Sequence, residues 1–449
     1  MSTNLLIKNI LILDPSRNLE QVGDVLVKDG DIVGTSVGGK TSANGIQSSG
    51  EVTILDGSGL WISPGFIDLH THLRDFGQTE KEDVETGTKA AAAGGFTHVT
   101  AMANTDPPLD SAPLLAMLLT KIANKAVVNV LPVVCVTKGM KGEELTNMVQ
   151  LANLGAMAFS DDGLPVHNLG VLRRALEYAT LTDKPIISHA EDRDLSSGGV
   201  IHEGANSTRL GLPGIPAASE TAAIAREIEV TRQSRGRIHF AHVSCAASVE
   251  LIRLAKEAGL NVTADVTPHH LTLTVDDIKE YDTHFKMNPP LRTKADQDAM
   301  VEGLKNGIID AIATDHAPHT NLEKQRPFDE APFGVIGLET AFALTLKRLV
   351  KEAGMSKLAF IELLTTKPAN IISLPVPHLD KQEKANFVIM DPAHHWQYRA
   401  KDGASRSTNS PYSGQKLTGK VLLTCCNGKI AYEDRSALKT RLQDVVKKI

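Results

Sequence analysis

Two histidines two residues apart follow an apolar run near residue 66. The segment reads DLHTHLR over residues 68–74. In an extended strand, side chains two positions apart point to the same side of the chain, so His70 and His72 would present their imidazoles together. Such a pair can chelate a metal ion, but two buried, hydrogen-bonded histidines would leave the same pattern. The pair alone does not decide between a metal site and ordinary packing.

Other residues with suitable chemistry end later apolar, β-branched runs. His189, His242 and Asp315 end the fifth, sixth and eighth of eight such runs, and Asp161-Asp162 ends the fourth. In a barrel of parallel strands, the carboxyl ends of all strands meet at the face where the active site is built. Imidazole and carboxylate ligands suit Zn²⁺ or a similar divalent ion, and a carboxylate can also bridge two ions. The sequence therefore predicts a metal site at this face.

The elements that would position these residues alternate along the chain. Between about residue 62 and residue 320, short β-branched runs alternate with segments of helical period, several of which end at a glycine typical of helix C-caps. The expected strands are 62–70, 97–104, 127–136, 156–162, 185–191, 238–244, 261–270 and 310–317. Eight strands with seven linking helices favour a TIM-like (β/α)8 barrel of the α/β class. A doubly wound open sheet is the structural alternative.

The two chain ends are expected to form a second, smaller unit. The short strands expected there are 4–13, 21–35, 385–392 and 420–434. We expect a composite β-sandwich domain with boundaries at 1–61 and 375–435, beside a catalytic barrel over 62–374. Residues 436–449 read as a C-terminal helix. The polar segments 37–50 and 402–415 read as surface loops.

Composition limits the class of function. The 449 residues carry a formal net charge of -6 and are 42% hydrophobic, as is typical of a soluble globular protein. A basic surface for nucleic acid is not indicated, no run of 18 apolar residues predicts a membrane span, and the first residues lack the pattern of a signal peptide. The cysteines have no CxxC spacing and fit a reducing cytoplasm; they are Cys135, Cys245, Cys425 and Cys426. Small molecules are the expected partners.

Eight segments match a known family in order and spacing. They are PGFIDLHTHLRD, GGFTHVTAMANTDP, GAMAFSDDG, IISHAED, FAHVS, ADVTPHHLTLT, KMNPPLR and ATDHAPH. Together they resemble the class I bacterial dihydroorotases of the amidohydrolase superfamily, over essentially the whole chain. The resemblance implies a cytoplasmic, zinc-dependent cyclic amidohydrolase. Its reaction would be the reversible closure of N-carbamoyl-L-aspartate to (S)-dihydroorotate plus water, the third step of de novo pyrimidine biosynthesis.

The same resemblance implies a centre of two zinc ions per chain. Its ligands would be His70, His72 and Asp315 for the more buried ion, and His189 and His242 for the second. Asp162 and a hydroxide would bridge the two ions, whereas hydantoinases and allantoinases use a carboxylated lysine there. Asp161 is the alternative bridge, and otherwise it would support the site through hydrogen bonds. The hydroxide would attack the ring amide, and Asp315 would carry the proton to the leaving nitrogen.

Substrate-binding positions follow from the resemblance in the same way. The matched positions are His72, Arg74, Asn104, Asn288, His319, Phe333 and Gly334. Arg74, Asn104 and His319 would bind the substrate carboxylate, which suits the planar fork of an arginine. Asn288 would contact the ring amide and ureido groups. The backbone at Phe333 and Gly334 would complete the pocket.

Two departures from the family pattern lie near the expected substrate side. Phe76 and Ala103 stand where proline is usual, and neither removes a metal ligand. One alternative function is another cyclic-amide hydrolase, such as a dihydropyrimidinase or allantoinase, which Arg74, Asn104 and the missing lysine disfavour. The other is a non-catalytic partner of aspartate transcarbamoylase, which the complete ligand set disfavours. We further expect a homodimer, with aspartate transcarbamoylase as a candidate partner of the enzyme.

Overall fold

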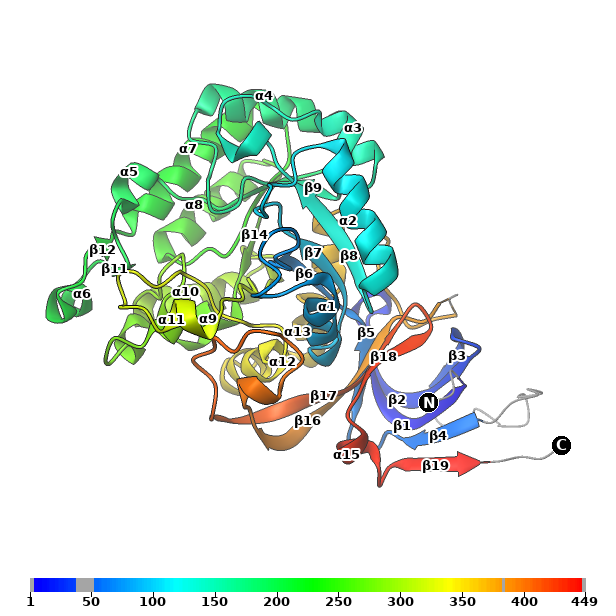
Figure 1. Ribbon diagram of the computed structural model, residues 1–449. Helices are drawn as coiled ribbons and strands as arrows, with labels where there is room; N and C mark the ends of the chain where they lie inside the picture. The colour runs from blue at the N-terminus through cyan, green and yellow to red at the C-terminus, as the bar shows by residue number, and fades with distance from the viewer. Residues whose placement is uncertain (1–3, 38–51, 382–383, 446–449) are drawn as a thin grey trace.

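A computed structural model describes residues 4–37, 52–381 and 384–445 of the chain. Its central element is a sheet of eight parallel strands in the order β15-β14-β13-β10-β9-β8-β7-β6. In chain order these strands are β6 (Phe66–Thr71), β7 (Phe96–Ala101), β8 (Asn129–Val134), β9 (Ala158–Phe159), β10 (Ile186–Ser188), β13 (Ile238–Phe240), β14 (Val262–Val266) and β15 (Ala311–Ile312). Helices surround this sheet, and a second sheet built from the chain ends lies beside it (Figure 1).

The first and last strands of the sheet meet and nearly close it into a barrel. Thr71 forms a parallel bridge with His316, and the backbone N–H of His72 donates to the carbonyl of His316 at 2.9 Å. Asp68 adds a side-chain link, because its carboxylate accepts hydrogen bonds from the N–H of Thr314 at 2.9 Å and from its hydroxyl at 2.5 Å. The expected TIM-like (β/α)8 class is confirmed.

The barrel helices begin where the sequence supplies caps. The longer helices between strands are α1 (Val84–Ala93), α2 (Ala112–Lys125), α3 (Met148–Asn153), α4 (Leu169–Ala179), α7 (Ala218–Ser234), α8 (Ala246–Glu257) and α10 (Lys294–Lys305). Asp83 and Thr293 each complete a capping box at the start of α1 and α10. The shorter pieces are η1 (Pro15–Arg17), η3 (Lys138–Met140), α5 (Arg193–Ser196), β11 (Ile201–His202), α6 (Ala205–Leu210), β12 (Gly214–Ile215), α9 (Pro268–Thr272), η4 (Val275–Asp277), η5 (Thr283–Phe285), α11 (Asn321–Lys324), α12 (Ala341–Thr345), η6 (Leu346–Glu352), α13 (Lys357–Glu362), α14 (Thr366–Ile371) and η7 (Ala400–Asp402).

The first expected strand is divided between the two sheets. β5 (Trp61–Pro64) pairs with strands of the chain-end sheet, and the barrel strand begins only at Phe66. The break falls at Gly65, where a Cβ would lie 2.2 Å from the side chain of Thr97. The prediction of one strand over 62–70 was therefore wrong. The seventh expected strand also ends early, because Pro268 begins α9.

Within the described residues, nine strands from the two chain ends form the second sheet. They are β1 (Leu5–Asp14), β2 (Leu19–Lys28), β3 (Asp31–Val37), β4 (Val52–Asp56), β5, β16 (Phe387–Gln397), β17 (Lys416–Cys426), β18 (Lys429–Glu433) and β19 (Leu442–Val445). β1 pairs with β4 along its first residues and with β5 further on, so the sheet divides there into two arms. The expected association of both chain ends in one β unit is confirmed.

The C-terminal helix expected over 436–449 does not form in the described part of that segment. Arg435–Leu438 forms one helical turn, α15, and Leu442–Val445 forms β19, antiparallel to β4. The edge of β4 offers backbone hydrogen-bonding groups, and pairing them outweighs the weak helical preference of a short terminal segment. Residues 446–449, and 38–50 of the loop expected over 37–50, lie outside the described residues.

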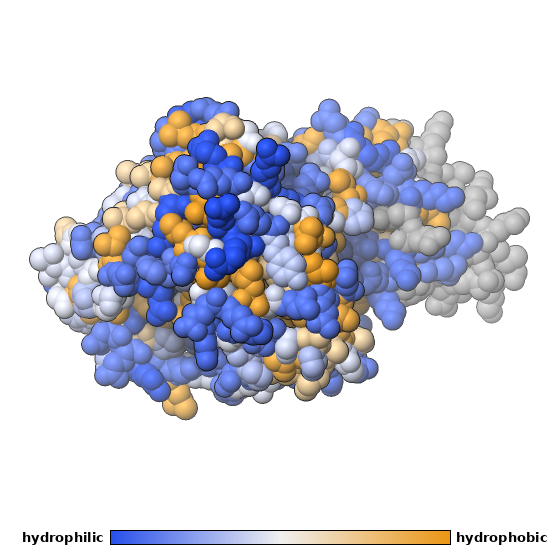
Figure 2. Space-filling model, turned by 90° about the horizontal axis from the view of Figure 1, so that it is seen from above, coloured by the Kyte–Doolittle hydropathy of each residue, from blue (hydrophilic) through white to orange (hydrophobic). Residues whose placement is uncertain are grey.

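Hydrophobic side chains gather in several cores, of which one lies between the barrel sheet and its helices and another between the arms of the chain-end sheet. Phe96, Phe159 and Phe240 are 0% exposed in the first core, and Ile10 and Leu423 are 0% exposed in the second. Hydrophilic and hydrophobic residues are interspersed over the molecular face shown in Figure 2. Among the residues that the structure describes, no helix has the length and apolar character needed to cross a membrane.

Glu227 is a buried carboxylic acid between α7 and the barrel sheet. It is 1% exposed and accepts a hydrogen bond from the hydroxyl of Ser188 at 2.6 Å. Burial raises the pKa of Glu227 to about 7, although Ser188, Arg226 and His189 oppose the shift. A folded-state pKa above the unfolded value stabilises the fold at low pH. This contribution is lost as the pH rises from about 4.5 to about 7, and the loss amounts to about 3 kcal/mol.

Replacing Glu227 by glutamine should therefore stabilise the protein at pH 8 and change its stability little at pH 5. In urea unfolding at pH 8, the free energy of unfolding of E227Q should exceed that of the parent by about 2–3 kcal/mol. Glu229→Gln, on the same helix with its side chain 65% exposed, is the control and should show no such pH dependence. An equal difference between E227Q and the parent at both pH values would contradict the assignment.

Candidate metal centre

The six expected metal ligands lie together at the carboxyl ends of the barrel strands. They are His70 in β6, His72 just after it, Asp162 after β9, His189 after β10, His242 after β13 and Asp315 after β15. The ring centroids of His70 and His72 are 5.1 Å apart, those of His70 and His242 are 5.0 Å apart, and those of His189 and His242 are 4.7 Å apart. All six residues are buried. The barrel thus brings together side chains that are up to 245 positions apart in the sequence.

Asp162 stands between two pairs of histidines. Its Oδ1 lies 3.4 Å from Nε2 of His70 and 3.6 Å from Nδ1 of His189, and its Oδ2 lies 3.5 Å from Nε2 of His72. One set consists of His70, His72 and Asp162, and the other of Asp162, His189 and His242; within each set the ligand atoms lie within 4.8 Å of one another. The arrangement can hold two cations that share one carboxylate.

Several buried polar atoms of this cluster have no hydrogen-bond partner. Both ring nitrogens of His70, Oδ1 of Asp162 and Nδ1 of His242 are in this position. Each buried polar group without a partner costs about 1–3 kcal/mol, so a group of them in one place indicates a cation-binding site. Imidazole nitrogen and carboxylate oxygen are donors that zinc and similar divalent ions accept. The residues therefore fit a metal centre, and Asp315, with Oδ1 3.1 Å from Nε2 of His72, adds a further oxygen.

The pKa values of the cluster reflect the same complementarity of charge. Burial lowers the pKa of His70, but Asp162 and Asp315 outweigh burial and raise it to about 9. Burial also opposes the charged form of His189, but Asp162 and Glu191 raise its pKa to about 10. Burial raises the pKa of Asp162 and of Asp315, but the facing histidines outweigh it and hold both below the usual range. The site favours positive charge, for which protons and metal ions compete.

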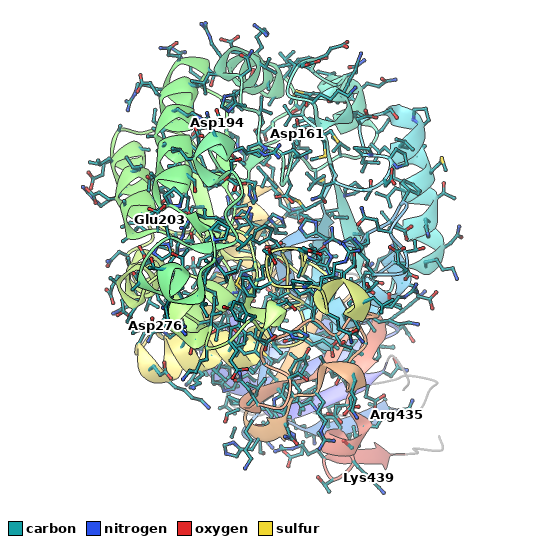
Figure 3. All side chains as sticks on the ribbon, turned by 60° about the vertical axis from the view of Figure 1, so that its left-hand side comes forward. Asp161, Asp194, Glu203, Asp276, Arg435 and Lys439 are labelled. Carbon is teal, nitrogen blue, oxygen red and sulfur yellow. The ribbon has the colours of Figure 1, made fainter. Side chains whose placement is uncertain are left out.

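Asp161 is committed to the loop after β8 rather than to the histidines. Its Oδ1 accepts hydrogen bonds from the backbone N–H groups of Val136 and Thr137, at 2.8 and 3.1 Å, and its Oδ2 accepts one from the hydroxyl of Thr137. Burial raises the pKa of Asp161 to about 6. Its label stands in the upper part of Figure 3. Of the two adjacent aspartates, Asp162 is the one that faces the cluster.

Two further aspartates, which the sequence analysis did not identify as site residues, hold the backbone of the ligands. Oδ1 of Asp68 accepts a hydrogen bond from the N–H of His70 at 3.2 Å, and Oδ1 of Asp265 accepts one from the N–H of His242 at 2.7 Å. His242 and Asp315 have φ values of 39° and 46°, which residues other than glycine seldom adopt. Such conformations persist where surrounding contacts fix them, and they concentrate at functional sites.

Arg74 and His319 meet at one side of the cluster. Nη2 of Arg74 lies 3.3 Å from Nε2 of His319, and Nε of Arg74 donates to the carbonyl of Pro318 at 3.2 Å. Gly334 packs against His319, because a Cβ there would lie 3.0 Å from Cδ2 of His319, and its φ of 135° favours glycine. Burial lowers the pKa of Arg74 to about 10, so the guanidinium stays charged. This corner can bind an anion.

Asn104 contacts the metal-ligand cluster directly. Its Oδ1 lies 2.9 Å from Nδ1 of His72, and its Nδ2 donates to Oδ2 of Asp162 at 3.1 Å. The structure therefore brings this expected substrate contact together with two of the expected metal ligands.

Asn288 and Phe333 lie at the other side, in the wall of a cavity of about 1080 Å³ that opens to solvent. Nδ2 of Asn288 is 3.3 Å from Nε2 of His189. Glu191, which the sequence analysis did not single out, lines the same cavity and lies 3.2 Å from both His189 and Asn288. Burial raises the pKa of Glu191, but His189 outweighs it and lowers the value to about 2.

The segment 402–415 is not the surface loop that its composition predicts. Asn409 is 0% exposed, accepts a hydrogen bond from the N–H of His319 at 3.1 Å, and donates to the carbonyls of Ala317 and Gly334, both at 3.0 Å. These bonds hold the backbone beside Arg74 and replace contacts with water. The composition could not reveal this role, because the partners of Asn409 are 75 to 92 positions away.

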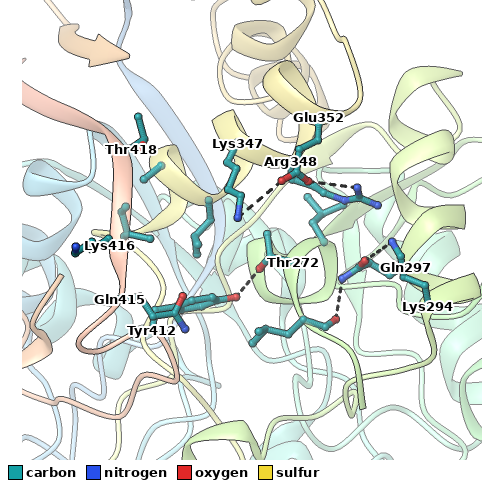
Figure 4. A pocket seen from close by; sticks show the side chains of 15 residues that line it. Thr272, Lys294, Gln297, Lys347, Arg348, Glu352, Tyr412, Gln415, Lys416 and Thr418 are labelled. Atoms are coloured by element: carbon teal, nitrogen blue, oxygen red, sulfur yellow. Dashed lines mark hydrogen bonds and ion pairs between the residues drawn. The ribbon is translucent and has the colours of Figure 1, made fainter. Parts of the chain in front are cut away.

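A second pocket, of about 460 Å³, lies between α9, α10, η6 and β17, and none of the expected site residues lines it (Figure 4). Most of its cationic side chains already have acidic partners. Lys294 and Arg348 each lie 2.6 Å from Oδ1 of Asp298, and Lys347 lies 3.8 Å from Glu352. The six expected metal ligands therefore lie at the mouth of the barrel, and none of them lines this pocket.

Proteins of similar sequence match nearly the whole chain. Residues 59–248 match the family model described as Dihydro-orotase-like. A dihydroorotase from Solibacter usitatus (strain Ellin6076) is 42% identical over 433 residues, which cover 96% of this chain and 99% of the relative. A dihydroorotase from Syntrophotalea carbinolica is 44% identical over 430 residues, which cover 95% of this chain and 99% of the relative.

Solved structures of lower identity share the fold. The L-hydantoinase (dihydropyrimidinase) from Arthrobacter aurescens has a TM-score of 0.84 at 22% identity and covers 99% of this chain and 98% of its own. The dihydropyrimidinase from Brevibacillus agri NCHU1002 has a TM-score of 0.81 at 22% identity and covers 96% of this chain and 95% of its own. At this identity, the likeness shows the fold alone.

Proposed function

The chain belongs to the dihydroorotase family of cyclic amidohydrolases, and from this premise we propose how its barrel carries out the reaction. N-carbamoyl-L-aspartate closes to (S)-dihydroorotate with loss of water, and the reverse reaction opens the ring. We assign both directions to a centre of two zinc ions that share Asp162. The observation that carries this proposal is the pair of three-residue ligand sets that have Asp162 in common.

In the proposed centre, each residue of the cluster has one role. The ligands are His70, His72 and Asp315 for one zinc ion, His189 and His242 for the other, and Asp162 for both. The unpartnered nitrogens of His70 and His242 and the unpartnered oxygen of Asp162 support this assignment. When bound, the metal pair lowers the pKa of water toward neutrality and polarises a carbonyl oxygen.

The other residues of the proposed site bind the substrate and move its proton. Arg74, His319 and Asn104 bind the substrate carboxylate, because the charged guanidinium offers two parallel N–H donors to its two oxygens. Asn288 contacts the ureido group, and the backbone at Phe333 and Gly334 closes the pocket. Asp315, whose low pKa keeps it ionised, accepts the proton of the attacking water and returns it to the leaving ring nitrogen.

A hydantoinase-type activity is the nearest alternative, because solved hydantoinases share the fold. Two features disfavour it. The segment 159–163 reads FSDDG and has no lysine to carry a bridging carboxylate, and Arg74 with His319 provides an anion site that an uncharged cyclic amide does not need. A purely structural role is disfavoured because the complete set of six ligands is assembled.

Steady-state assays on zinc-loaded protein test the proposed activity. Purified protein should hydrolyse dihydroorotate and cyclise N-carbamoyl-L-aspartate, and it should turn over hydantoin and dihydrouracil far more slowly. Turnover of hydantoin or dihydrouracil with none of dihydroorotate would refute the proposed substrate. No turnover of any substrate, with less than one zinc ion per chain, would favour the structural role.

Arg74→Met should weaken substrate binding and leave the metal in place. Losing a charge-assisted, two-point contact costs about 2–3 kcal/mol, so KM for N-carbamoyl-L-aspartate should rise about 30- to 160-fold. Arg74→Lys keeps the charge but not the planar fork, so its KM should lie between that of the parent and that of R74M. KM values for the three proteins at equal zinc content provide the measurement. An unchanged KM in R74M would show that the carboxylate binds elsewhere.

The wider organisation follows the same proposal. We assign the chain-end sheet, from β1 to β5 and from β16 to β19, to one composite domain in place of the expected 1–61 and 375–435. The barrel strands from β6 to β15, with their helices, form the catalytic domain. We also propose a cytoplasmic homodimer, with aspartate transcarbamoylase as a candidate partner. Sedimentation of the chain alone and with a transcarbamoylase tests both associations.

A further inference from the structure

Glu191 stands beside the second ligand set without belonging to it. It follows the last residue of β10 by three positions, and its side chain is 13% exposed. Its Oε2 lies 3.2 Å from Nε2 of His189 and 3.2 Å from Nδ2 of Asn288. One carboxylate oxygen therefore meets a candidate metal ligand on one side and a candidate substrate contact on the other.

The two nitrogens of His189 face different surroundings. Nδ1 lies 3.6 Å from Oδ1 of Asp162 and 3.0 Å from Nε2 of His242, inside the ligand set. A neutral imidazole carries a proton on one nitrogen and a lone pair on the other. Because an ionised carboxylate only accepts hydrogen bonds, the contact with Glu191 places the proton on Nε2. The lone pair of Nδ1 is then directed toward the ligand set, as a metal ligand requires.

The same contact determines how the amide of Asn288 is turned. Its NH₂ group must face Glu191, because a carboxylate has no hydrogen to donate. Nδ2 of Asn288 and Nε2 of His189 are then both donors, and their distance of 3.3 Å is explained by the oxygen of Glu191 that accepts from both. This orientation leaves the amide oxygen of Asn288 to accept a hydrogen bond from an N–H group in the cavity that Asn288 lines.

We propose that Glu191 is a positioning residue that sets the tautomer of His189 for metal binding and the amide orientation of Asn288 for an N–H group of the substrate. The inference rests on the proposed metal-dependent function and deepens it. It predicts a specific pattern of effects. Loss of the carboxylate weakens one metal ion and one substrate contact together, and it spares the ion held by His70 and His72, which Glu191 does not touch.

Glu191→Gln removes the charge and keeps the shape of the side chain. Asp194→Asn is the matched control, because Asp194 lines the same cavity from α5 with its side chain 90% exposed (Figure 3). Metal-free protein is titrated with Zn²⁺ in competition with a chromogenic chelator. E191Q should bind one zinc ion about 10- to 100-fold less tightly than the parent and the other with unchanged affinity. Its KM for dihydroorotate should rise about 10-fold, and D194N should match the parent in both measurements.

The outcomes separate this inference from the proposed function. If the parent binds no zinc, the proposed metal centre fails and this inference with it, before any variant is compared. If the parent binds two zinc ions and E191Q binds both as tightly, or loses both equally, Glu191 does not have the proposed role. Glu191→Asp is the second variant, to be used if E191Q does not fold. Its shorter side chain moves the carboxylate away from both His189 and Asn288. It should weaken one zinc ion selectively, and unchanged or equally weakened affinities would overturn the inference.

Discussion

Replacing Asp315 by asparagine is expected to lower kcat by about 10³-fold or more, while the protein keeps most of its zinc. The asparagine side chain retains an oxygen for the metal but cannot accept and release a proton at neutral pH. General acid–base catalysis contributes about 10²- to 10⁴-fold to a rate, and the same group serves both directions of the reaction. Hydrolysis of dihydroorotate and cyclisation of N-carbamoyl-L-aspartate should therefore fall together. The zinc content of each variant is measured on the same protein preparations that are used for the kinetics.

Asp310→Asn is the matched control for Asp315→Asn. Asp310 lies just before β15, as Asp315 lies shortly after it, and its carboxylate pairs with Lys256 at 2.7 Å. Asp310→Asn should cost some stability and leave kcat near that of the parent. A near-normal kcat in D315N would remove Asp315 from the proton path, and loss of zinc equal to the loss of kcat would make it a metal ligand only.

The parts of the site that the sequence predicts are those that follow from strand periodicity. His70 and His72 share one side of a strand, and His189, His242 and Asp315 follow other strands of the same parallel sheet. Because parallel strands run in the same direction, their carboxyl ends lie on one face of the barrel. The approximate convergence of these side chains can therefore be predicted without knowing the conformations of the loops. This is why the fold class and the grouping of the candidate ligands could be predicted together.

Other parts of the structure depend on contacts that no local pattern contains. Asn409 is buried because its side chain makes hydrogen bonds to the backbone of His319 and Gly334 that water would otherwise make. The composition of its own segment, however, predicts an exposed loop. Glu191 lies in the motif SHAED, but the residue that it contacts, Asn288, is 97 positions away in the sequence. β19 forms because the edge of β4 is available for pairing. In each case tertiary partners outweigh local preference.

Asp162→Asn should remove zinc as well as activity, and this separates it from Asp315→Asn and Arg74→Met. Oδ1 of Asp162 has no hydrogen-bond partner, and its two oxygens face histidines of both ligand sets at 3.4 to 3.6 Å. An amide has one oxygen and no charge, so it cannot bridge two cations as a carboxylate does. Zinc content should fall from two ions per chain to one or fewer, and kcat should fall at least about 10³-fold.

Asp161→Asn is the matched control for Asp162→Asn, because the two aspartates are adjacent and differ in what they face. Asp161 accepts its hydrogen bonds from Val136 and Thr137, so its replacement disturbs the loop after β8 and not the ligand sets. D161N should retain two zinc ions and lose about 1–3 kcal/mol of stability, because an amide cannot accept all three of those hydrogen bonds equally well. If instead D161N lost zinc and D162N kept it, Asp161 would be the bridge.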